Sequence, residues 1–342
     1  MYYSSHEVLE YDELRMLIAE GHRVFSIGHH FDPFALSGDL RPLLPGALDH
    51  QLFNEFHLTG CDLAQKKITK AFIRHFDIVV IMHDPILLLR NLDAFGDIPI
   101  VIRTIGQSDL SLEDTYRRLG NRIKIVRYSD RETALAGFAK TDAVIYFGKY
   151  GTDFLPWNGG NAGITFHNSY DFRDHSTVPA LEMWKQFGAA TGSELWGVGN
   201  GRVAASRGKA ATDQMRTLLS KASWYFYIYT FPPSYTLSLI EAMLAGVPVI
   251  APSLPLVESI YPDTMYGSLR AWSSPRYEVE EIVGDGGLFY NSIEQAIEIA
   301  GLLRSDPEYG RSLSNAARAN ALARFDAETI APRWSRFLNS IL

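Results

Sequence analysis

Glu241 and the residues just before it are the groups in this sequence best suited to binding chemistry. If a helix begins near Thr236, the backbone N–H groups of Tyr235, Thr236 and Leu237 lie at its positive end and have no acceptors within the helix. They can therefore hold a phosphate or a sugar hydroxyl. Glu241, one turn deeper, can accept hydrogen bonds from a ribose diol. The spacing predicts a site for a nucleotide or a nucleotide sugar at residues 235–241.

The flanking sequence supplies the strand and the helix that such a site needs. Residues 224–229 form an aromatic run of strand length, and Pro232 and Pro233 end it because proline has no backbone N–H to donate. Ser234 or Thr236 can cap the helix. Apolar residues then recur at helical spacing, and a glycine can end the helix. These residues are Leu237, Ile240, Met243, Leu244 and Gly246.

Polar residues also follow the predicted strands of the first half, at the edge where open parallel sheets bind ligands. His83 and Asp84 follow one apolar run, and their side chains can position or deprotonate an acceptor hydroxyl. Gly106 and Gln107 follow the next run, where the glycine lets the backbone approach a ligand. Structural roles stay open, because Asp84 before a proline is also an ordinary helix start and Gly106 also suits a loop without a ligand.

Arg173 and Ser176 follow the first predicted strand of the second half. Ser176 or Thr177 can cap the next helix, whose start favours an anion. Arg173 beside that start can clamp a diphosphate and neutralise its charge. The alternative for Arg173 is a structural or surface ion pair.

Apolar runs of strand length alternate with helical stretches along the whole chain, which favours parallel sheets. The runs are residues 22–27, 77–82, 98–102, 123–126 and 143–147, then 163–166, 195–198, 224–229 and 247–251. Residues 150–161 between the halves are rich in turn formers and mark a boundary. The sequence predicts an α/β protein of two doubly wound Rossmann-like domains, at 1–152 and 160–326, with ligands bound across the hinge.

Composition bounds the remaining classes of function. The 342 residues are 46% hydrophobic, enough for two domain cores. No stretch approaches the roughly 20 apolar residues that cross a membrane, and no secretory signal is visible. The single Cys61 excludes an internal disulfide and suits a reducing cytoplasm. No metal-binding motif is present, so we expect a cytoplasmic protein without a transmembrane segment and without a metal.

The net charge of −7 argues against a polyanion-binding protein. Residues 65–74 and 117–127 are locally basic, which leaves a nucleic-acid acceptor or an anionic lipid-linked acceptor open.

The segment 231–251 resembles the signature of the large retaining GT-B glycosyltransferase family (family four). In that signature a Glu and seven residues precede Glu-Ala-Met and a Gly-Val-Pro-Val run. Glu241 matches the second Glu, and Pro233 stands where the family has the first. The family's first Glu contacts the donor sugar, so Pro233 leaves the donor sugar and the choice between retention and inversion open. Residues 281–290 and the helices after Ser292 also resemble the family's C-terminal end.

The resemblance implies the GT-B fold, in which two Rossmann-like domains have sheets facing a cleft. It implies that the C-terminal domain binds the nucleotide sugar, that the N-terminal domain binds the acceptor, and that a last helix at about 327–342 packs back on the N-terminal domain. It also implies that Arg173 neutralises the leaving diphosphate and that a His near His83 serves the acceptor side. No tightly bound cofactor is expected, and the co-substrate is a nucleoside diphosphate sugar of the UDP or GDP type.

We therefore expect a hexosyltransferase-like enzyme that moves a sugar to an acceptor hydroxyl. The acceptor is open among a glycan, a lipid-linked sugar, a protein, a small metabolite and a hydroxylated DNA base. Two alternatives remain: a non-catalytic nucleotide-sugar-binding protein, motivated by Pro233, and a GT-B epimerase that acts on the nucleotide sugar itself.

Overall fold

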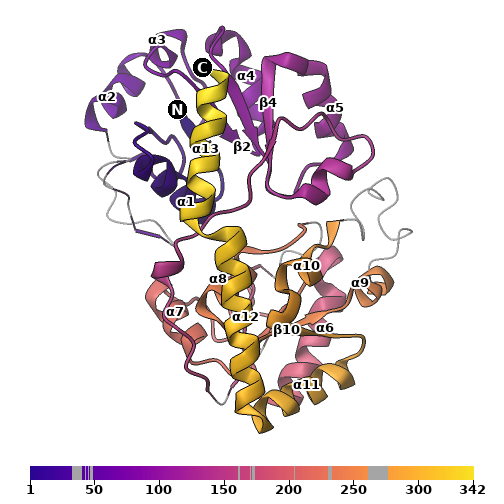
Figure 1. Cartoon of the computed structure of the whole chain (residues 1–342). Helices are drawn as coiled ribbons and strands as arrows, with labels where there is room; N and C mark the ends of the chain where they lie inside the picture. Colours follow the sequence, from indigo (N-terminus) through magenta and orange to yellow (C-terminus); the bar gives the residue numbers. More distant parts are fainter. Residues whose placement is uncertain are drawn as a thin grey trace. The chain divides into compact units, whose positions relative to one another are not determined.

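The computed structural model of the chain describes residues 1–342 except 33–40, 43, 45, 47–48, 161, 170, 172–173, 204, 230–232 and 261–275, with only the backbone described at 174–180. The chain divides into two compact units (Figure 1). Unit 1 contains Met1–Gly148 and Ala327–Leu342, and unit 2 contains Lys149–Asp326. Within the described ranges, no helix has the length and apolar character needed to cross a bilayer.

Unit 1 is built on a five-stranded parallel sheet whose described strands lie in the order β1-β2-β3-β4-β5. The strands are β1 (Tyr2–Ser4), β2 (Val79–Met82), β3 (Ile100–Arg103), β4 (Ile123–Arg127) and β5 (Ala143–Val144). The helices are α1 (Glu7–Ala19), α2 (His50–Leu58), α3 (Lys70–Ile73), α4 (Pro85–Phe95), α5 (Leu110–Leu119) and α13 (Ala327–Ile341), with 3₁₀ turns η2 (Gly120–Arg122) and η3 (Asp130–Ala134).

The central strands of unit 1 are apolar because helices cover both faces of a parallel sheet. Every residue of β2 and β3 is buried. Val79 lies opposite Ile100, which lies opposite Ile123, so the carboxyl ends of β2, β3 and β4 share one edge. Helices start near this edge at side-chain caps, such as Asp84 before α4 and Asp109 before α5.

Unit 2 contains a second five-stranded parallel sheet, with its described strands in the order β10-β9-β8-β6-β7. The strands are β6 (Ile164–Phe166), β7 (Glu194–Trp196), β8 (Tyr225–Phe226), β9 (Val249–Pro252) and β10 (Gly287–Tyr290). The helices are α6 (Asp174–Thr191), α7 (Thr212–Ser220), α8 (Leu237–Ala245), α9 (Leu254–Ile260), α10 (Val279–Val283), α11 (Ile293–Ser305) and α12 (Pro307–Phe325), with 3₁₀ turns η4 (Gly151–Asp153) and η9 (Gly284–Gly286).

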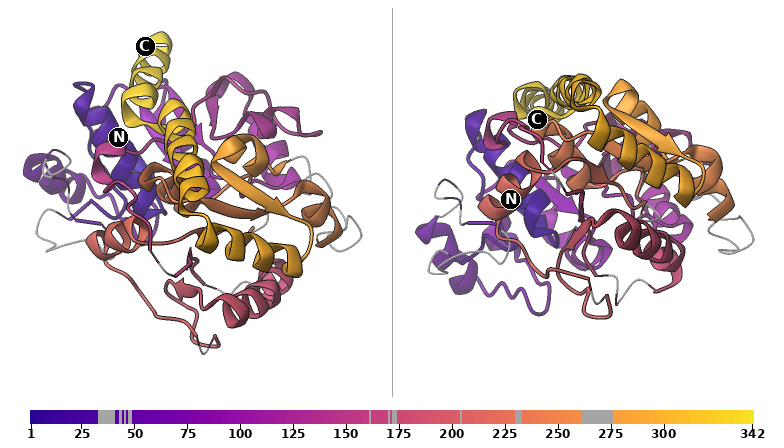
Figure 2. Two further views of the ribbon diagram at one scale, coloured as in Figure 1. Left: turned by 60° about the horizontal axis from the view of Figure 1, so that its bottom comes forward. Right: turned by 90° about the horizontal axis from the view of Figure 1, so that it is seen from below.

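The core of unit 2 lies between its sheet and the surrounding helices. Phe187 of α6 stacks on Phe226 of β8, with ring centroids 4.0 Å apart, and Phe226 stacks on Tyr290 of β10 at 5.4 Å. Helix α11 packs against α6 and β10 (Figure 2). The two parallel sheets and their surrounding helices confirm the predicted α/β fold class.

Some elements differ from the sequence expectations. The run 22–27 does not form a full strand but a single parallel bridge between Ser26 and Tyr2. The run 224–229 is a strand only at Tyr225–Phe226. Strands β1 and β10 were not expected, because each is a short segment beside a helix and shows no clear alternation.

Helix α13 belongs to unit 1 and packs against α1 (Figure 1). Trp334 of α13 is fully buried, and the Arg103 guanidinium lies 5.3 Å from the centroid of its ring. Arg103 is itself buried and donates a 2.8 Å hydrogen bond to Glu13 of α1. The charged pair is therefore covered by an aromatic side chain from the last helix.

Candidate functional site

Helix α8 starts at the carboxyl edge of the second sheet, as the sequence predicts. Thr236 caps it by accepting the Leu239 N–H at 3.4 Å, and Gly246 ends it with a left-handed φ of 83°. The first-turn N–H groups of Leu237 and Ser238 have no acceptor within the helix. These amides and the helix dipole can hold an anionic oxygen.

The start of α8 is hydrogen-bonded to the sheet through the hydroxyl groups of Ser238 and Tyr225. The Tyr225 hydroxyl, at the start of β8, donates to Ser238 Oγ at 2.9 Å and to the Phe166 carbonyl at 3.3 Å. Burial, and the charge of Glu241, raise the pKa of Tyr225, while its hydrogen bonds to Ser238 and Phe166 act in the opposite direction. Tyr225 therefore stays a neutral donor that fixes the helix start to strands β6 and β8.

The predicted ribose-binding residue Glu241 lies in the second turn of α8 and is 5% exposed. Its Oε1 atom accepts from the Lys149 ammonium at 2.9 Å, and Lys149 is 2% exposed. A buried carboxylate with one cationic partner can still accept further hydrogen bonds, because it has about four acceptor positions. The sequence places Lys149 at a predicted strand exit, after an apolar run and a glycine, but does not pair it with Glu241.

The backbone of Lys149 is also fixed. Its N–H donates to the Phe325 carbonyl at 2.9 Å, and Lys149 forms a parallel bridge with Asp326. Arg318 of α12 donates to the carbonyls of Leu244 and Gly151, so the same segment is tied to the end of α8. The Lys149 side chain therefore reaches Glu241 from an anchored backbone.

Tyr235 lies just before the start of α8, and its ring points into the protein interior. The ring is 1% exposed and packs against Phe325, with centroids 5.4 Å apart. Pro233, at the position of the family's first Glu, is partly buried. Pro233 has no side-chain acceptor for a sugar hydroxyl.

The exits of β6 and β7 are joined to each other beside this helix start. Asn168 Oδ1 accepts the Val198 N–H at 3.0 Å, and Asn200 donates to the His167 carbonyl at 2.7 Å. A Cβ atom at Gly197 would lie 1.8 Å from the His167 carbonyl oxygen, so only glycine permits this approach.

Two of the predicted phosphate-binding residues cannot be placed by side chain. Arg173 lies outside the described residues, and Ser176 lies in the first turn of α6, where only the backbone is described. Their roles stay predictions.

His83 occupies a strained position at the end of β2. Its φ is 47°, which is uncommon for a residue with a Cβ atom. Its N–H donates to the Arg103 carbonyl at 3.1 Å, and its Nδ1 atom is buried without a hydrogen-bond partner among the described residues. Burial lowers the pKa of His83 below its usual value, although the nearby carboxylates of Asp84 and Asp109 act in the opposite direction. A neutral imidazole is the form that accepts a proton.

Asp84 has structural partners. It caps α4 by accepting the Leu87 N–H at 2.8 Å, and it pairs with the Lys66 ammonium. Burial alone would raise the pKa of Asp84, but hydrogen bonds from Lys66, Leu87 and Tyr3 outweigh that effect and lower it. Asp84 is therefore an ionised cap next to His83.

The loop after β3 adds a further polar group to this edge of unit 1. Gly106 is buried with a φ of 82°, whereas Gln107 is exposed. Ser108 is fully buried, and its Oγ atom has no hydrogen-bond partner within the described part of the chain. His83 and Ser108 thus place two unsatisfied polar atoms at the exits of neighbouring strands, which is unusual in a folded protein. Ser108 ends the segment 103–108, whose hydrogen-bonding side chains already mark it in the sequence as a possible ligand-binding strand exit.

Glu10 of α1 forms hydrogen bonds with the segment 26–30 in unit 1. The Glu10 carboxylate accepts from the Ser26 hydroxyl and from the N–H groups of His29 and His30. A Cβ atom at Gly28 would lie 2.5 Å from the same carboxylate. Residues 26–30 therefore have a fixed path at the end of the short run that pairs with β1.

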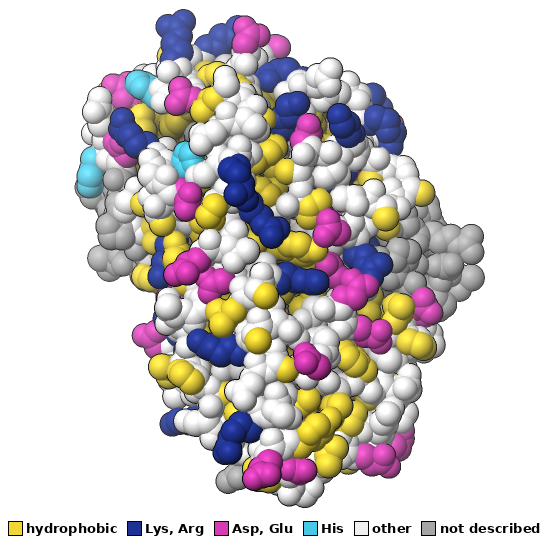
Figure 3. Space-filling model, viewed as in Figure 1, with side chains coloured by type: hydrophobic (Ala, Val, Ile, Leu, Met, Phe, Trp, Pro, Cys, Tyr) yellow, Lys and Arg dark blue, Asp and Glu magenta, His cyan; other side chains and the backbone are white. Residues whose placement is uncertain are grey.

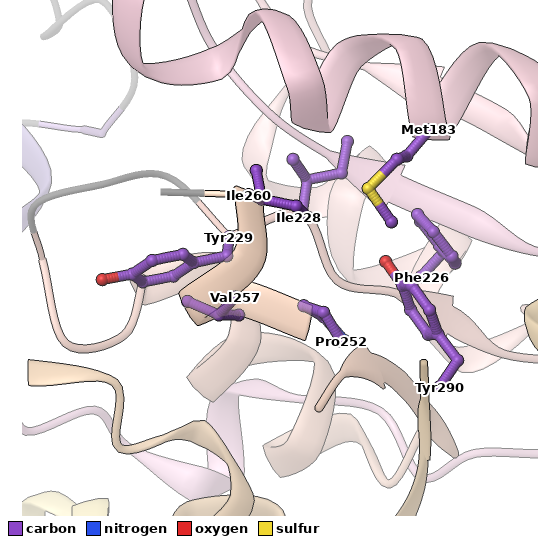
Figure 4. Close-up of a pocket in the computed structure, with 8 residues that line it drawn as sticks. All are labelled: Met183, Phe226, Ile228, Tyr229, Pro252, Val257, Ile260 and Tyr290. Atoms are coloured by element: carbon purple, nitrogen blue, oxygen red, sulfur yellow. The ribbon is translucent and has the colours of Figure 1, made fainter. Parts of the chain in front are cut away.

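Two cavities among the described residues are lined by other side chains. A small apolar cavity of about 10 Å³ in unit 2 is lined by side chains from α6, α9 and the ends of β8, β9 and β10 (Figure 4). Met183 of α6 points toward Phe226 and Tyr290 there. This volume holds about one water molecule at most, so it is a packing defect and not a sugar site.

A larger groove of about 650 Å³ in unit 1 is lined by residues at the amino ends of β3 and β4 and by α13. It lies at the opposite edge of the sheet from His83. Where the chain is described, no group of three or more His, Cys, Asp or Glu side chains could hold a metal ion.

Comparison with known proteins places the fold. No protein-family model and no curated protein sequence matches the chain. Among the solved structures that match it, the following three are examples that match over nearly their whole lengths. Sucrose-phosphate synthase from Thermosynechococcus elongatus is 15% identical with a TM-score of 0.63, and the match covers 98% of this chain and 92% of that chain.

HepE of Anabaena in complex with UDP-glucose is 14% identical with a TM-score of 0.62, covering 99% of this chain and 98% of that one. A glycosyltransferase from Rickettsia africae is 12% identical with a TM-score of 0.63, and the match covers 99% of this chain and 97% of that chain. At such identities the likeness is one of fold. This chain has the fold of the GT-B glycosyltransferases.

Proposed function

We propose that this protein is a glycosyltransferase that moves a sugar from a nucleoside diphosphate sugar to an acceptor hydroxyl. The observation that carries the proposal is the start of α8 with its buried Glu241, at the edge of the sheet where open α/β sheets bind ligands. The fold comparison also supports the proposal, because the chain matches HepE, solved with UDP-glucose, over nearly its whole length.

Donor binding is assigned to unit 2. The amides of Leu237 and Ser238 at the positive end of α8 stabilise the diphosphate as it leaves, when its negative charge increases. Glu241 accepts hydrogen bonds from the ribose hydroxyls. Arg173 and Ser176 near the start of α6 complete the phosphate site in this proposal. The donor is of the UDP type, since UDP and UDP-glucose occupy the HepE structures.

Acceptor binding is assigned to unit 1. A neutral His83 accepts the proton of the attacking hydroxyl, or orients that hydroxyl by a hydrogen bond. The unsatisfied Ser108 hydroxyl and the backbone at Gly106 are further partners for a sugar or polyol acceptor. Asp84, which caps the start of α4 and pairs with Lys66, keeps a negative charge beside His83. Gln107 is exposed and free to contact an acceptor from the rim.

The surface charge bears on the class of acceptor. On the surface seen in Figure 3, basic and acidic side chains are interspersed among the coloured residues. A net charge of −7 with mixed surface charges favours a neutral glycan or polyol over duplex DNA, which needs a continuous basic surface. Retention of the anomeric configuration is proposed from the family signature alone.

The proposal is tested by the release of nucleoside diphosphate from UDP-glucose, other UDP-hexoses and GDP-mannose, with and without mono- and oligosaccharide acceptors. We expect release of UDP that increases with an acceptor, together with a new glycoside. Conversion of the donor sugar without any acceptor would instead indicate an epimerase. Tight donor binding without release across the panel would indicate a silent binding protein.

A further inference from the structure

The groove at the amino edge of the first sheet has no part in the proposed transfer reaction. Its volume of about 650 Å³ lies within the range of roughly 300 to 1,000 Å³ that is typical of small-molecule sites. Its lining comes from the amino ends of β3, β4 and β5 and from the last turns of α13. All of these elements belong to unit 1. The groove is therefore formed within one compact unit and is large enough for a small ligand.

The walls of the groove are held by hydrogen bonds to the backbone. The Arg122 guanidinium donates to the Ile98 carbonyl at 3.1 Å. Asp142 Oδ2 accepts the Ile125 N–H at 2.9 Å, and Oδ1 lies 3.4 Å from the Lys124 ammonium. These contacts fix the walls before a ligand binds, which reduces the entropy lost on binding.

The charges that line the groove favour a neutral ligand. They come from two cationic and two anionic side chains, Arg122, Lys124, Asp97 and Asp142. Arg122 already donates to the Ile98 carbonyl, and Lys124 is paired with Asp142. The exposed Asp97 carboxylate makes no hydrogen bond or ion pair with any described residue. A phosphate or a carboxylate in the groove would be repelled by that free negative charge, so nucleotides and other anions are disfavoured.

The rest of the lining has the chemistry that binds a sugar. Phe337 of α13 is half-buried beside the groove, and its ring contacts Trp334 edge to face, with centroids 6.4 Å apart. Such a ring can cover the apolar C–H face of a sugar. Asp97 and the exposed amide of Asn121 offer acceptors and donors for the hydroxyl groups. Apolar contact on one face and hydrogen bonds at the rim together fit a neutral saccharide.

We propose that this groove is a second carbohydrate site, which binds a neutral oligosaccharide with one sugar ring on Phe337 and its hydroxyls on Asp97 and Asn121. The site is separate from the acceptor site proposed at His83, because it lies at the opposite edge of the same sheet. Its role, though not the binding itself, rests on the proposed function. A long glycan acceptor bound there stays at a high effective concentration near the enzyme between transfers.

The experiment measures the binding of neutral tetrasaccharides to the full chain by calorimetry. The probes are maltotetraose, cellotetraose, tetra-N-acetylchitotetraose and mannotetraose, and we expect at least one of them to bind. Phe337→Leu keeps an apolar side chain but removes the ring, so it should weaken binding of that probe by about 10-fold or more, as loss of an aromatic anchor usually does.

A double variant tests the rim independently of α13. Asp97→Ala combined with Asn121→Ala removes two hydrogen-bonding groups and should weaken binding by roughly 10-fold. Both residues are exposed, so their replacement should leave the fold intact. Asp93→Ala is the matched control, because Asp93 is an exposed carboxylate of α4 that does not line the groove. Its affinity for the probe, and the affinity of every variant for UDP, should equal that of the unmodified protein.

Absence of binding by every probe would overturn the inference, and so would an unchanged affinity in Phe337→Leu. A loss of affinity in His83→Asn alone would also overturn it, because the probe would then occupy the proposed acceptor site. If Phe337→Leu does not fold, an unchanged affinity in the double variant overturns the inference equally. Failure to bind UDP, or to release it from UDP-glucose, would instead reject the proposed function and leave the second carbohydrate site standing.

Discussion

Buried polar residues lie at the edges of both sheets. In unit 2, Glu241 and Lys149 satisfy each other at 2.9 Å. In unit 1, Nδ1 of His83 and Oγ of Ser108 have no partner among the described residues. Unsatisfied buried groups cost free energy, so their persistence next to a strained φ at His83 suggests a function.

Replacement of His83 by Asn should lower kcat by about 10² to 10⁴-fold, the usual contribution of a general base or acid. Nucleotide binding should stay unchanged, because His83 lies in unit 1. Since burial lowers the pKa of His83, the neutral, active form persists below the usual value of about 6.5. Activity that depends on it should be lost only as the pH falls through that lower pKa.

The measurement is kcat against pH for the unmodified protein and His83→Asn, with His75→Asn as control because His75 is exposed in the same unit. An unchanged kcat in His83→Asn, or an acidic decline already complete at pH 6.5, would contradict the assignment.

At the scale of single residues, type and spacing predict Glu241 and His83 as site residues, and their roles stay predictions. Both stand directly at a strand exit or one turn into a helix, which are local properties. Their partners were not predictable in the same way. Lys149 meets Glu241 only because the segment after β5 pairs with the end of α12. Such contacts between distant parts of the chain leave no local pattern.

At the scale of elements, α8 shows why some boundaries can be predicted. A cap at Thr236, apolar residues at helical spacing and a left-handed Gly246 agree with each other, and the observed helix is Leu237–Ala245. The run 22–27 has an apolar pattern as well, but it pairs with β1 only at Ser26. Its next residues are instead held by the buried Glu10. Tertiary contacts there outweigh the strand propensity.

Replacement of Thr236 by Val should lower the free energy of unfolding by about 1 kcal/mol, since the Leu239 N–H loses its side-chain acceptor. Thr236→Ser keeps that acceptor and should stay close to the unmodified protein. Urea denaturation followed by circular dichroism measures the difference. A loss in Thr236→Ser with no loss in Thr236→Val would show that the methyl group and not the cap stabilises α8.

At the scale of the whole molecule, alternating strands and helices predict parallel sheets, and both sheets are parallel. The strand order could not be predicted, because it depends on which crossover connections pack together. The membership of α13 in unit 1 is also a property of the complete fold. The buried Trp334 of α13 covers the Arg103 guanidinium, which is hydrogen-bonded to Glu13. Both Arg103 and Glu13 are far from Trp334 in the sequence.

Replacement of Trp334 by Ala should lower the free energy of unfolding of unit 1 by about 3 to 5 kcal/mol, because a large side chain leaves a cavity above a buried ion pair. Leu342→Ala, at a residue that is 72% exposed, is the control and should change stability by less than about 0.5 kcal/mol. Denaturation in urea measures both. A loss in Trp334→Ala no larger than in the control would contradict the role of α13 in unit 1.

We propose that unit 2 binds a nucleoside diphosphate sugar at the start of α8. This proposal is tested most directly by the melting temperature of the protein with a panel of nucleoside diphosphates and their sugars, for the unmodified chain and for Glu241→Ala. A ligand that binds only the native state at about 100 times its Kd stabilises it by about 2.7 kcal/mol. We expect a selective shift with UDP and UDP-sugars that is much smaller in a folded Glu241→Ala variant. No shift with any member of the panel, or the same shift in both proteins, would contradict the account.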